Sequence, residues 1–343
     1  MTCYIYYLQF DAPFHIDAQG NHFYTQASQW IHSDTLSSAI AINWAKLYGD
    51  WPFDTHESSI DLPYQVSSCF PFVYHEQKPL SFLPKPKISD SLAFSQNKAE
   101  NLRLAKQFKK IQWVDIDYWQ ALTSGRWLSD LASDLTESSK CYQGFLSRQS
   151  VFTCQPVLTE SVATRTATSR IDNQAKEGQL FDFSQIFMND QAGLYCLAQF
   201  NDDQAKAKFE SALALLGDEG LGADRAVGRG LFSVANPRGT ICSFYQSPQT
   251  GYPAALLSLA NPKDSECDIN LLGQQANYEL TSRGGWISGS GLRKNRVRAF
   301  SEASILDQPF KGRIVDLTPT SNQHNHPVYR DLRAFCMGVT HNA

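Results

Sequence analysis

The chain has 343 residues, of which 42% are hydrophobic and 19% are charged. This length and composition are typical of a globular protein with one large domain or two smaller ones, and we expect two. Thirty Lys and Arg residues against 34 Asp and Glu residues give a formal net charge of -4. That balance excludes the overall basicity of a histone-like nucleic-acid binder, so any site for an anion must be local.

The sequence holds no stretch of 18 or more uncharged apolar residues, and its first residues lack a basic segment followed by an apolar run. We therefore expect neither membrane insertion nor secretion. The 8 cysteines are scattered singly and form no C-x-x-C pair. They are expected to be small buried side chains in a reducing cytoplasm, with no metal and no cofactor.

The first predicted elements are a strand and a helix. Residues 2–10, TCYIYYLQF, are aromatic and β-branched enough for a strand. Ser33 and Asp34 are good N-caps for a helix whose apolar residues follow at helical spacing, and Gly49 supplies its stop. Two strands around a turn at residues 76–79 are expected next, within residues 66–83.

Two basic segments follow these strands. The PKPK sequence at residues 84–87 is predicted to be an exposed, positively charged elbow, since proline suits neither a helix interior nor a central strand. Residues 98–111 carry five cations and one acid, on a helix with Leu102, Leu104 and Phe108 on its apolar side. A solvated helix face is the ordinary explanation of such a run.

The second half of the chain begins with a change in composition. Residues 151–182 are rich in Thr, Ser and Ala, which predicts a long, mobile hairpin or loop. A strand at 193–200 precedes a helix that Asp202 or Asp203 caps and Gly217 ends, and only strands are expected from Leu231 onward.

This order predicts an α+β fold with two ferredoxin-like (RRM-like) domains, each a helix-backed antiparallel sheet. The expected domains are residues 1–150, with the basic helix inserted, and residues 151–343.

The glycine-rich segment at residues 220–230, GLGADRAVGRG, lies between the second helix and the next expected strand. Its four glycines permit positive φ and leave N–H groups bare, and Arg225 and Arg229 add forked donors, so a phosphate chain could lie against it. The order of residues is neither that of a P-loop nor that of a dinucleotide fingerprint. A tight turn with no ligand remains the alternative.

The segment TSRGGWISGSGLRKNRVR at residues 281–298 contains five cations and no acid. Such a run favours a local site for an anionic polymer, although an exposed hairpin tip kept for solubility would look the same. On a strand, Arg296 and Arg298 would face one side, and Val297 and Ala299 the other. Arg165 and Arg170, with short hydroxyls between them, are a weaker signal of the same kind.

The histidines give little support for an enzyme. The string His32, Ser33, Asp34 suggests a hydrolase, but a catalytic triad is recognised by geometry and no G-x-S-x-G elbow is present. Helix capping explains the string better. His324 and His326 form an H-x-H without a third ligand at a sensible spacing, so no metal site is predicted.

Four motifs in order resemble those of the RAMP superfamily. They are SDTL at residues 33–36, LPKP at 83–86, RIDNQAKEGQLF at 170–181 and GLGADRAVGRG at 220–230. With a late basic strand ending in Phe-Ser-Glu at 300–302, their order and spacing resemble the Cas-five group, and within it subunit four of the type III-A CRISPR Csm complex. The resemblance runs from about residue 4 to about residue 315.

The resemblance implies a non-catalytic subunit that binds the repeat-derived 5′ handle of the guide RNA (crRNA). It also implies contacts with the large subunit, subunit one, and with the backbone subunit, subunit three. A protruding thumb hairpin at about 159–182 would wedge between guide and target, and so would meet target RNA indirectly. The candidate RNA-binding residues are Ser33, Lys85, Lys87, Arg165, Arg170, Gly220, Gly222, Arg225, Gly228, Arg229, Gly230, Arg283, Arg293, Lys294, Arg296 and Arg298.

Two other functions stay open. One is a related RAMP endoribonuclease that cuts repeat RNA, with His32 or another histidine as general acid or base. The other, with least support, is a small-molecule hydrolase with a Ser/His centre.

Overall fold

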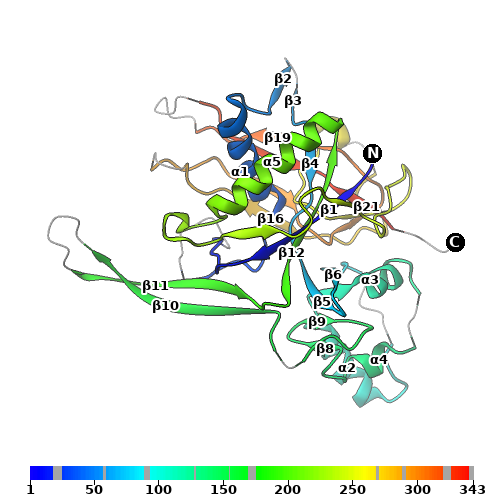
Figure 1. Ribbon diagram of the computed structural model, residues 1–343. Helices are drawn as coiled ribbons and strands as arrows, with labels where there is room; N and C mark the ends of the chain where they lie inside the picture. The colour runs from blue at the N-terminus through cyan, green and yellow to red at the C-terminus, as the bar shows by residue number, and fades with distance from the viewer. Residues whose placement is uncertain are drawn as a thin grey trace.

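The computed structural model describes residues 1–17, 25–56, 59–88, 93–126, 129–153, 155–168, 175–267, 270–287, 291–319 and 326–339. A ten-stranded sheet forms the centre of an α+β fold (Figure 1). Its lateral order is β13-β1-β12-β5-β6-β7-β9-β8, with β14 on β1 and β4 on β12. The strands are β1 (Tyr4–Phe10), β4 (Tyr64–Val66), β5 (Phe70–His75), β6 (Lys78–Pro84), β7 (Trp113–Asp115), β8 (Cys141–Tyr142), β9 (Phe145–Leu146), β12 (Ala192–Phe200), β13 (Phe232–Val234) and β14 (Thr240–Ile241).

Two long helices, α1 (Ser33–Tyr48) and α5 (Asp203–Glu219), lie next to each other over one face of this sheet (Figure 1). Successive side chains along β1 point to opposite faces of the sheet, and both faces are covered. Tyr6 and Leu8 pack into the hydrophobic cluster beneath the helices, whereas Cys3 and Ile5 belong to the cluster on the opposite face. The predicted first strand and first helix are confirmed.

The sheet crosses the predicted domain boundary at residue 150. In chain order β1, α1, β4, β12, α5 and β13 form a strand–helix–strand–strand–helix–strand unit, with the lateral order β13-β1-β12-β4. Strand β12 pairs antiparallel with β1 on one side and with β4 and β5 on the other. Since strands from both sides of residue 150 alternate in one sheet, that residue does not separate two sheets.

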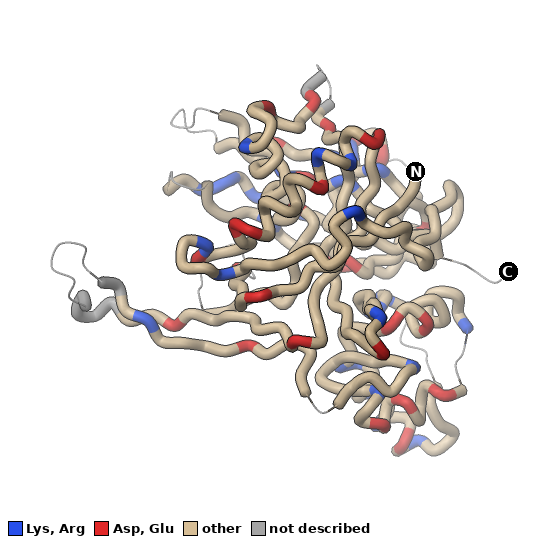
Figure 2. The backbone as a smooth tube through the Cα atoms, in the orientation of Figure 1, with Lys and Arg blue, Asp and Glu red and all other residues tan. Residues whose placement is uncertain are grey.

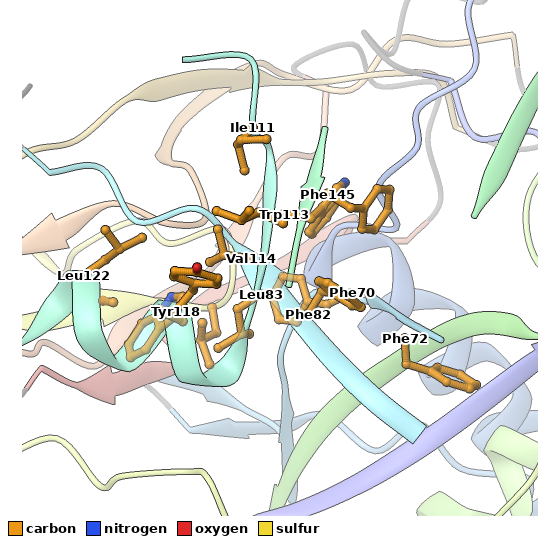
Figure 3. Packing of buried hydrophobic residues seen from close by; sticks show 14 of the residues in the cluster. Phe70, Phe72, Phe82, Leu83, Ile111, Trp113, Val114, Tyr118, Leu122 and Phe145 are labelled. Atoms are coloured by element: carbon orange, nitrogen blue, oxygen red, sulfur yellow. The ribbon is translucent and has the colours of Figure 1, made fainter. Parts of the chain in front are cut away.

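A small lobe extends the sheet on the far side of β5. It contains α2 (Lys98–Lys109), α3 (Ile116–Thr123) and α4 (Leu131–Asp134) around a core of large side chains that includes Phe82, Trp113 and Tyr118 (Figure 3). The predicted basic helix is α2, capped by the Asn97 side chain. Its apolar side is narrower than predicted, because Leu102 is 57% exposed.

The predicted hairpin is formed by β10 (Leu158–Thr168) and β11 (Ala175–Met188), which extend from the body as a two-stranded ribbon (Figure 1). Their antiparallel register places Arg165 opposite Phe181 and Ala163 opposite Phe183. Arg170, a candidate RNA-binding residue of this region, lies outside the described residues.

The region after β14 forms small sheets rather than a second large one. The sheets are β18-β15-β21, β16-β17 and β19-β20, and a further pair, β2-β3, lies earlier in the chain. The bounds are β2 (Asp54–His56), β3 (Ser59–Asp61), β15 (Ala254–Leu256), β16 (Leu280–Arg283), β17 (Val297–Phe300), β18 (Ile305–Leu306), β19 (Gly312–Asp316), β20 (Tyr329–Arg333) and β21 (Cys336–Gly338), with 3-10 turns η1 (Arg225–Val227) and η2 (Asp264–Glu266).

The described part of this region contains strands and 3-10 turns but no α-helix, as the sequence predicts. The second helix-backed sheet expected for residues 151–343 is not formed there, because α5 covers the main sheet instead. Among the helices that the structure describes, none has the length and apolarity needed to cross a membrane.

Helix α5 ends two residues later than predicted. Gly220, with φ 82°, follows Glu219 and its N–H bonds to Leu216 O. Gly217 lies inside the last turn, where a Cβ atom would be 2.3 Å from the Phe232 carbonyl oxygen. Gly217 therefore allows the helix to approach β13 closely rather than ending it.

Candidate nucleic-acid interface

The glycine-rich loop, residues 220–230, is a tightly packed turn between α5 and β13. Gly220, Gly222, Gly228 and Gly230 have φ values of 82°, 99°, 78° and 72°. A Cβ at Gly230 would lie 2.0 Å from Leu221 O, and one at Gly222 would lie 2.3 Å from His15 O. These glycines are needed for positive φ and for close approach of backbone to backbone.

Several N–H groups of this loop are used inside the protein. Leu221 N donates to Gly230 O at 2.9 Å, and Ala223 N donates to His15 O at 2.9 Å. Gly230 N donates to Pro13 O at 3.0 Å. The prediction that bare loop N–H groups receive a phosphate is therefore wrong for these three, and the loop offers its side chains instead.

The exposed part of the loop is its apex. The Arg225 side chain is 49% exposed and lies 4.0 Å from the Glu219 carboxylate, while Val227 is 69% exposed. Arg229 is half-buried. Arg225 is thus the loop cation that is most open to a ligand.

Arg165, on the hairpin, points to the same loop. Its guanidinium forms an ion pair with Asp224 and lies 3.9 Å from the centroid of the Phe183 ring. The structure thus brings together two regions that the sequence singled out separately, but it gives Arg165 partners within the protein.

The basic segment 281–298 has one arginine directed inward. Arg283, 8% exposed, donates from Nε to Asp34 Oδ2 at 2.9 Å and from Nη2 to Asp34 Oδ1 at 3.1 Å. Arg330 forms a second ion pair with the same carboxylate. Burial alone would raise the pKa of Asp34, but the two guanidinium groups hold it well below its usual range. We therefore remove Arg283 from the candidate interface.

Ser33 and Asp34 do not cap α1, which corrects the sequence prediction. The N-cap is His32, and its side chain makes no capping bond. Ser33, 4% exposed, accepts a hydrogen bond from Leu259 N at 3.1 Å, and its own N–H donates to Ser68 Oγ at 2.8 Å. The SDTL motif therefore joins α1 to the C-terminal strands, and Ser33 also leaves the candidate interface.

His32 contacts a buried carboxylate that sequence reasoning did not select as a site residue. Its Nδ1 lies 2.8 Å from Glu302 Oε1, and Ser68 Oγ donates to the same oxygen. Burial would raise the pKa of Glu302, but His32 and the Ser68 hydroxyl lower it below the usual value. The Trp30 ring stacks on the His32 ring, with 6.1 Å between the two ring centroids. This packing favours a structural His–Glu pair.

The other three arginines of the basic segment are exposed to solvent. Arg293, Arg296 and Arg298 are exposed, whereas Ala299 is buried, so the predicted alternation along this strand is confirmed. Arg293 lies 4.7 Å from the Trp286 ring centroid. We call Arg293, Arg296 and Arg298 the arginine row.

Lys294, in the same basic segment, lies near the ion pairs of Asp34. It is half-buried, and its pKa is lowered by burial and by the nearby Arg330. Elsewhere along the backbone, Lys and Arg alternate with Asp and Glu (Figure 2). The positive charge of this chain is therefore local, as its net charge requires.

The PKPK elbow is half-buried, not exposed. Lys85 Nζ donates to Phe108 O at 2.8 Å and lies 4.5 Å from the Phe108 ring centroid. Lys87 Nζ is 2.5 Å from Glu279 Oε2. Both ammonium groups hold segments of the protein together, so neither is a strong candidate for RNA contact.

Strand β20 supplies a polar contact that sequence reasoning missed. Asp331 accepts from Ser37 Oγ at 2.9 Å, and Arg333 pairs with Asp331 at 2.9 Å and with Asp61 at 2.6 Å. These bonds join α1 and β3 to β20. The signal in the sequence is the charged string YRDLR at 329–333, with cations at 330 and 333, which by itself suggests an exposed edge strand.

The structure describes only the second histidine of the H-x-H motif. His326 Nδ1 lies 3.0 Å from Pro327 O, and His324 is outside the described residues. No group of three or more metal-binding side chains occurs in the part of the chain that the structure describes.

Comparison with known proteins gives consistent matches. The family described as the CRISPR Csm4 C-terminal domain matches residues 249–339. A Methanocaldococcus jannaschii protein described as CRISPR system Cms protein Csm4 is 23% identical over 347 residues, covering 88% of this chain and 89% of its own. A Mycobacterium tuberculosis protein with the same description is 28% identical over 193 residues, covering 52% and 57% of the two chains.

Solved structures share the fold over nearly the whole length. A chain of the Csm3–Csm4 subcomplex in the type III-A CRISPR-Cas interference complex has a TM-score of 0.65 at 19% identity, covering 99% of this chain and 100% of that one. A chain of the Csm1–Csm4 cassette in complex with pppApA has a TM-score of 0.58 at 16% identity, covering 99% and 98%. The chain is therefore Csm4-like: residues 249–339 match the Csm4 C-terminal family, and nearly the whole chain is similar to Csm4 proteins in sequence and in fold.

Proposed function

We propose that this protein is a non-catalytic, RNA-binding subunit of a type III-A Csm complex in the cytoplasm. In this role it binds the 5′ handle of the crRNA and links the large subunit, Csm1, to the backbone subunit, Csm3. The solved relatives support such an assembly, since they include a Csm3–Csm4 subcomplex and a Csm1–Csm4 cassette.

The observation that carries the RNA-binding role is the arginine row. Its three guanidinium groups lie in a short stretch without an acid, and Arg293 stacks on Trp286. Single-stranded RNA is bound by positive surfaces that follow its backbone, with aromatic rings or guanidinium planes beside the bases. Arg225 and Arg229, on the glycine-rich loop, are the second group of cations that we assign to RNA.

The architecture fits the same role. We propose that β1, α1, β4, β12, α5 and β13 form a ferredoxin-like domain, because this is the element order and lateral strand order of that fold. The small lobe and the β10–β11 hairpin are then insertions between its second and third strands, and the hairpin is the thumb that reaches toward target RNA.

The test compares two triple variants of the full chain. Arg293→Ala, Arg296→Ala and Arg298→Ala together remove the arginine row, while Lys98→Ala, Lys106→Ala and Lys109→Ala remove equal charge from α2. Binding of a single-stranded RNA with the repeat-derived 5′ end is measured at several salt concentrations. We expect the first variant alone to lower affinity, and to reduce the slope of log K against log salt by about 0.7 per lost phosphate contact.

Equal losses in both variants would contradict a site at the arginine row, because net charge would then explain binding. Metal-free cleavage of repeat RNA that His32→Gln abolishes would overturn the non-catalytic role. It would favour the endoribonuclease instead.

A further inference from the structure

We propose that Arg165 is a positioning residue that fastens the β10–β11 hairpin to the glycine-rich loop, so that a ligand bound at the loop also fixes the hairpin. We call the contacts among Arg165, Phe183, Asp224 and His15 the hairpin latch. This coupling goes beyond the RNA-binding role, which assigns the two regions no connection.

Two interactions converge on the Arg165 guanidinium. It pairs with Asp224 at the start of η1, and its centre lies 3.9 Å from the centroid of the Phe183 ring. Phe183 is 1% exposed, so it is a fixed surface beneath the cation. Arginine is suited to this place because its planar group stacks on a ring while donating to a carboxylate at its edge.

The segment just after β1 completes the latch. Phe14 and Ile186 exchange backbone hydrogen bonds of 3.0 and 2.8 Å, which attach the segment to β11. His15 Nδ1 lies 2.7 Å from Ser184 O, and its ring is 4.7 Å from that of Phe183. His15 O accepts the N–H of Ala223 from the loop. The hairpin, this segment and the loop therefore make one closed set of contacts.

The loop is built to present the carboxylate of the latch. Asp224 has φ 61°, a left-handed conformation that Asp and Asn adopt more readily than other residues with a side chain. The Arg165 side chain is only 28% exposed, with one face of its guanidinium on the Phe183 ring and an edge on the Asp224 carboxylate. Arg165 therefore acts through Asp224 and Phe183 rather than as an RNA contact.

The first experiment needs no RNA. Hydrogen exchange by mass spectrometry on the full chain follows peptides that contain the amides of Phe14, Ile186 and Ala223. Arg165→Met removes the charge and keeps the length, and Asp224→Asn removes the negative charge of the partner while suiting the left-handed conformation. We expect both to speed exchange of these amides by about tenfold, because the opening that exposes them becomes easier.

The matched control is Thr164→Val. Thr164 is the neighbour of Arg165 on the opposite face of the hairpin, where its hydroxyl donates to Asp182 at 2.8 Å in solvent. Valine keeps the preference for a strand. Exchange unchanged in Thr164→Val and faster in both latch variants supports the latch, whereas unchanged exchange in Asp224→Asn overturns it.

The second experiment rests on the proposed RNA-binding function. A single-stranded RNA with the repeat-derived 5′ end is added, and exchange in β10 and β11 is compared with and without it. We expect RNA to protect the hairpin in the wild type but not in Arg165→Met, with affinity changed by no more than about twofold. A large loss of affinity with hairpin protection intact would make Arg165 an RNA contact and overturn the latch.

The two failures are distinguishable. If the wild type binds no RNA, the proposed function fails while the RNA-free exchange still decides whether the latch exists.

Discussion

The glycine-rich loop and the β16–β17 hairpin have similar compositions but use their residues differently. In the loop, Gly220, Gly222 and Gly230 are enclosed by neighbouring backbone, and an arginine points outward at the apex. In the hairpin, a Cβ atom added at Gly285 or Gly291 would meet no described atom within 4 Å, while Arg283 points into the interior. A run of Gly and Arg therefore predicts a turn, but does not say which of its groups remain available for a ligand.

The largest expected effect is on stability, and it distinguishes the buried Arg283 from the exposed arginines of the row. Arg283→Met should lower the free energy of unfolding by about 3 kcal/mol, because it leaves the buried Asp34 carboxylate with one guanidinium fewer. Arg298→Met, on the exposed side of the neighbouring strand, should change it by less than about 0.5 kcal/mol. Urea unfolding measures both, and similar losses in the two variants would contradict the distinction.

Two glycines within the loop sharpen the comparison. Gly230→Ala should cost about 2 to 3 kcal/mol of stability, because the new Cβ meets Leu221 O in addition to the strain of positive φ. Gly228 also has a positive φ, but a Cβ added there would meet only the Leu231 side chain, 4.0 Å away. Gly228→Ala is therefore expected to lower the free energy of unfolding by about 1 kcal/mol. Thermal unfolding of both variants at one pH tests the pair. If the two variants are equally destabilised, the close contact with Leu221 O is not the reason that position 230 requires glycine.

A smaller effect is expected at the elbow before the lobe. Lys85→Met should lower stability by about 1 kcal/mol, since the ammonium group loses the Phe108 carbonyl and ring. RNA affinity should stay the same. A fall in affinity without a fall in stability would return Lys85 to the interface.

The smallest expected effect is on how steeply the free energy of unfolding changes with pH. The folded protein lowers the pKa of Glu302, so the stabilising contribution of its charge is complete above the unfolded value of about 4.3 and is lost as pH falls through the folded value. Unfolding free energies measured from about pH 5.5 down to about pH 3.5 should therefore fall less steeply in Glu302→Gln than in the wild type.

Glu279→Gln is the control for this measurement, because the Glu279 side chain is 68% exposed. It should keep the wild-type slope. Identical slopes in the wild type and Glu302→Gln would show that the His32–Glu302 pair does not contribute to acid sensitivity.

Much of the fold is local in origin, and that part could be predicted. The apolar spacing of α1, the alternation of β1 and the Thr-rich hairpin depend on near neighbours in sequence. The pairing of β1 with β12 could not be read in the same way, because it depends on contacts between segments far apart in the chain. For that reason the sequence did not predict a sheet that contains strands from both sides of residue 150.

The candidate site was predictable in outline but not in detail. Cation-rich segments mark where positive charge gathers, and the arginine row lies in one of them. Whether an arginine meets solvent or a buried carboxylate depends on its distant partner, as Arg283 and Asp34 show. The glycine spacing predicted the turn correctly, whereas the use of its N–H groups depends on residues 13–15.

The place of β12 between β1 and β5 also governs how the chain must fold during synthesis. Tyr7 pairs with Tyr195, about 190 residues later. At typical rates of translation, β1 waits on the order of 10 to 40 s before its central partner is made. During that time the small lobe has local partners of its own, while the aromatic face of β1 has none of its native sheet neighbours. The topology therefore leaves this first strand without its central partner until more than half of the chain has been made.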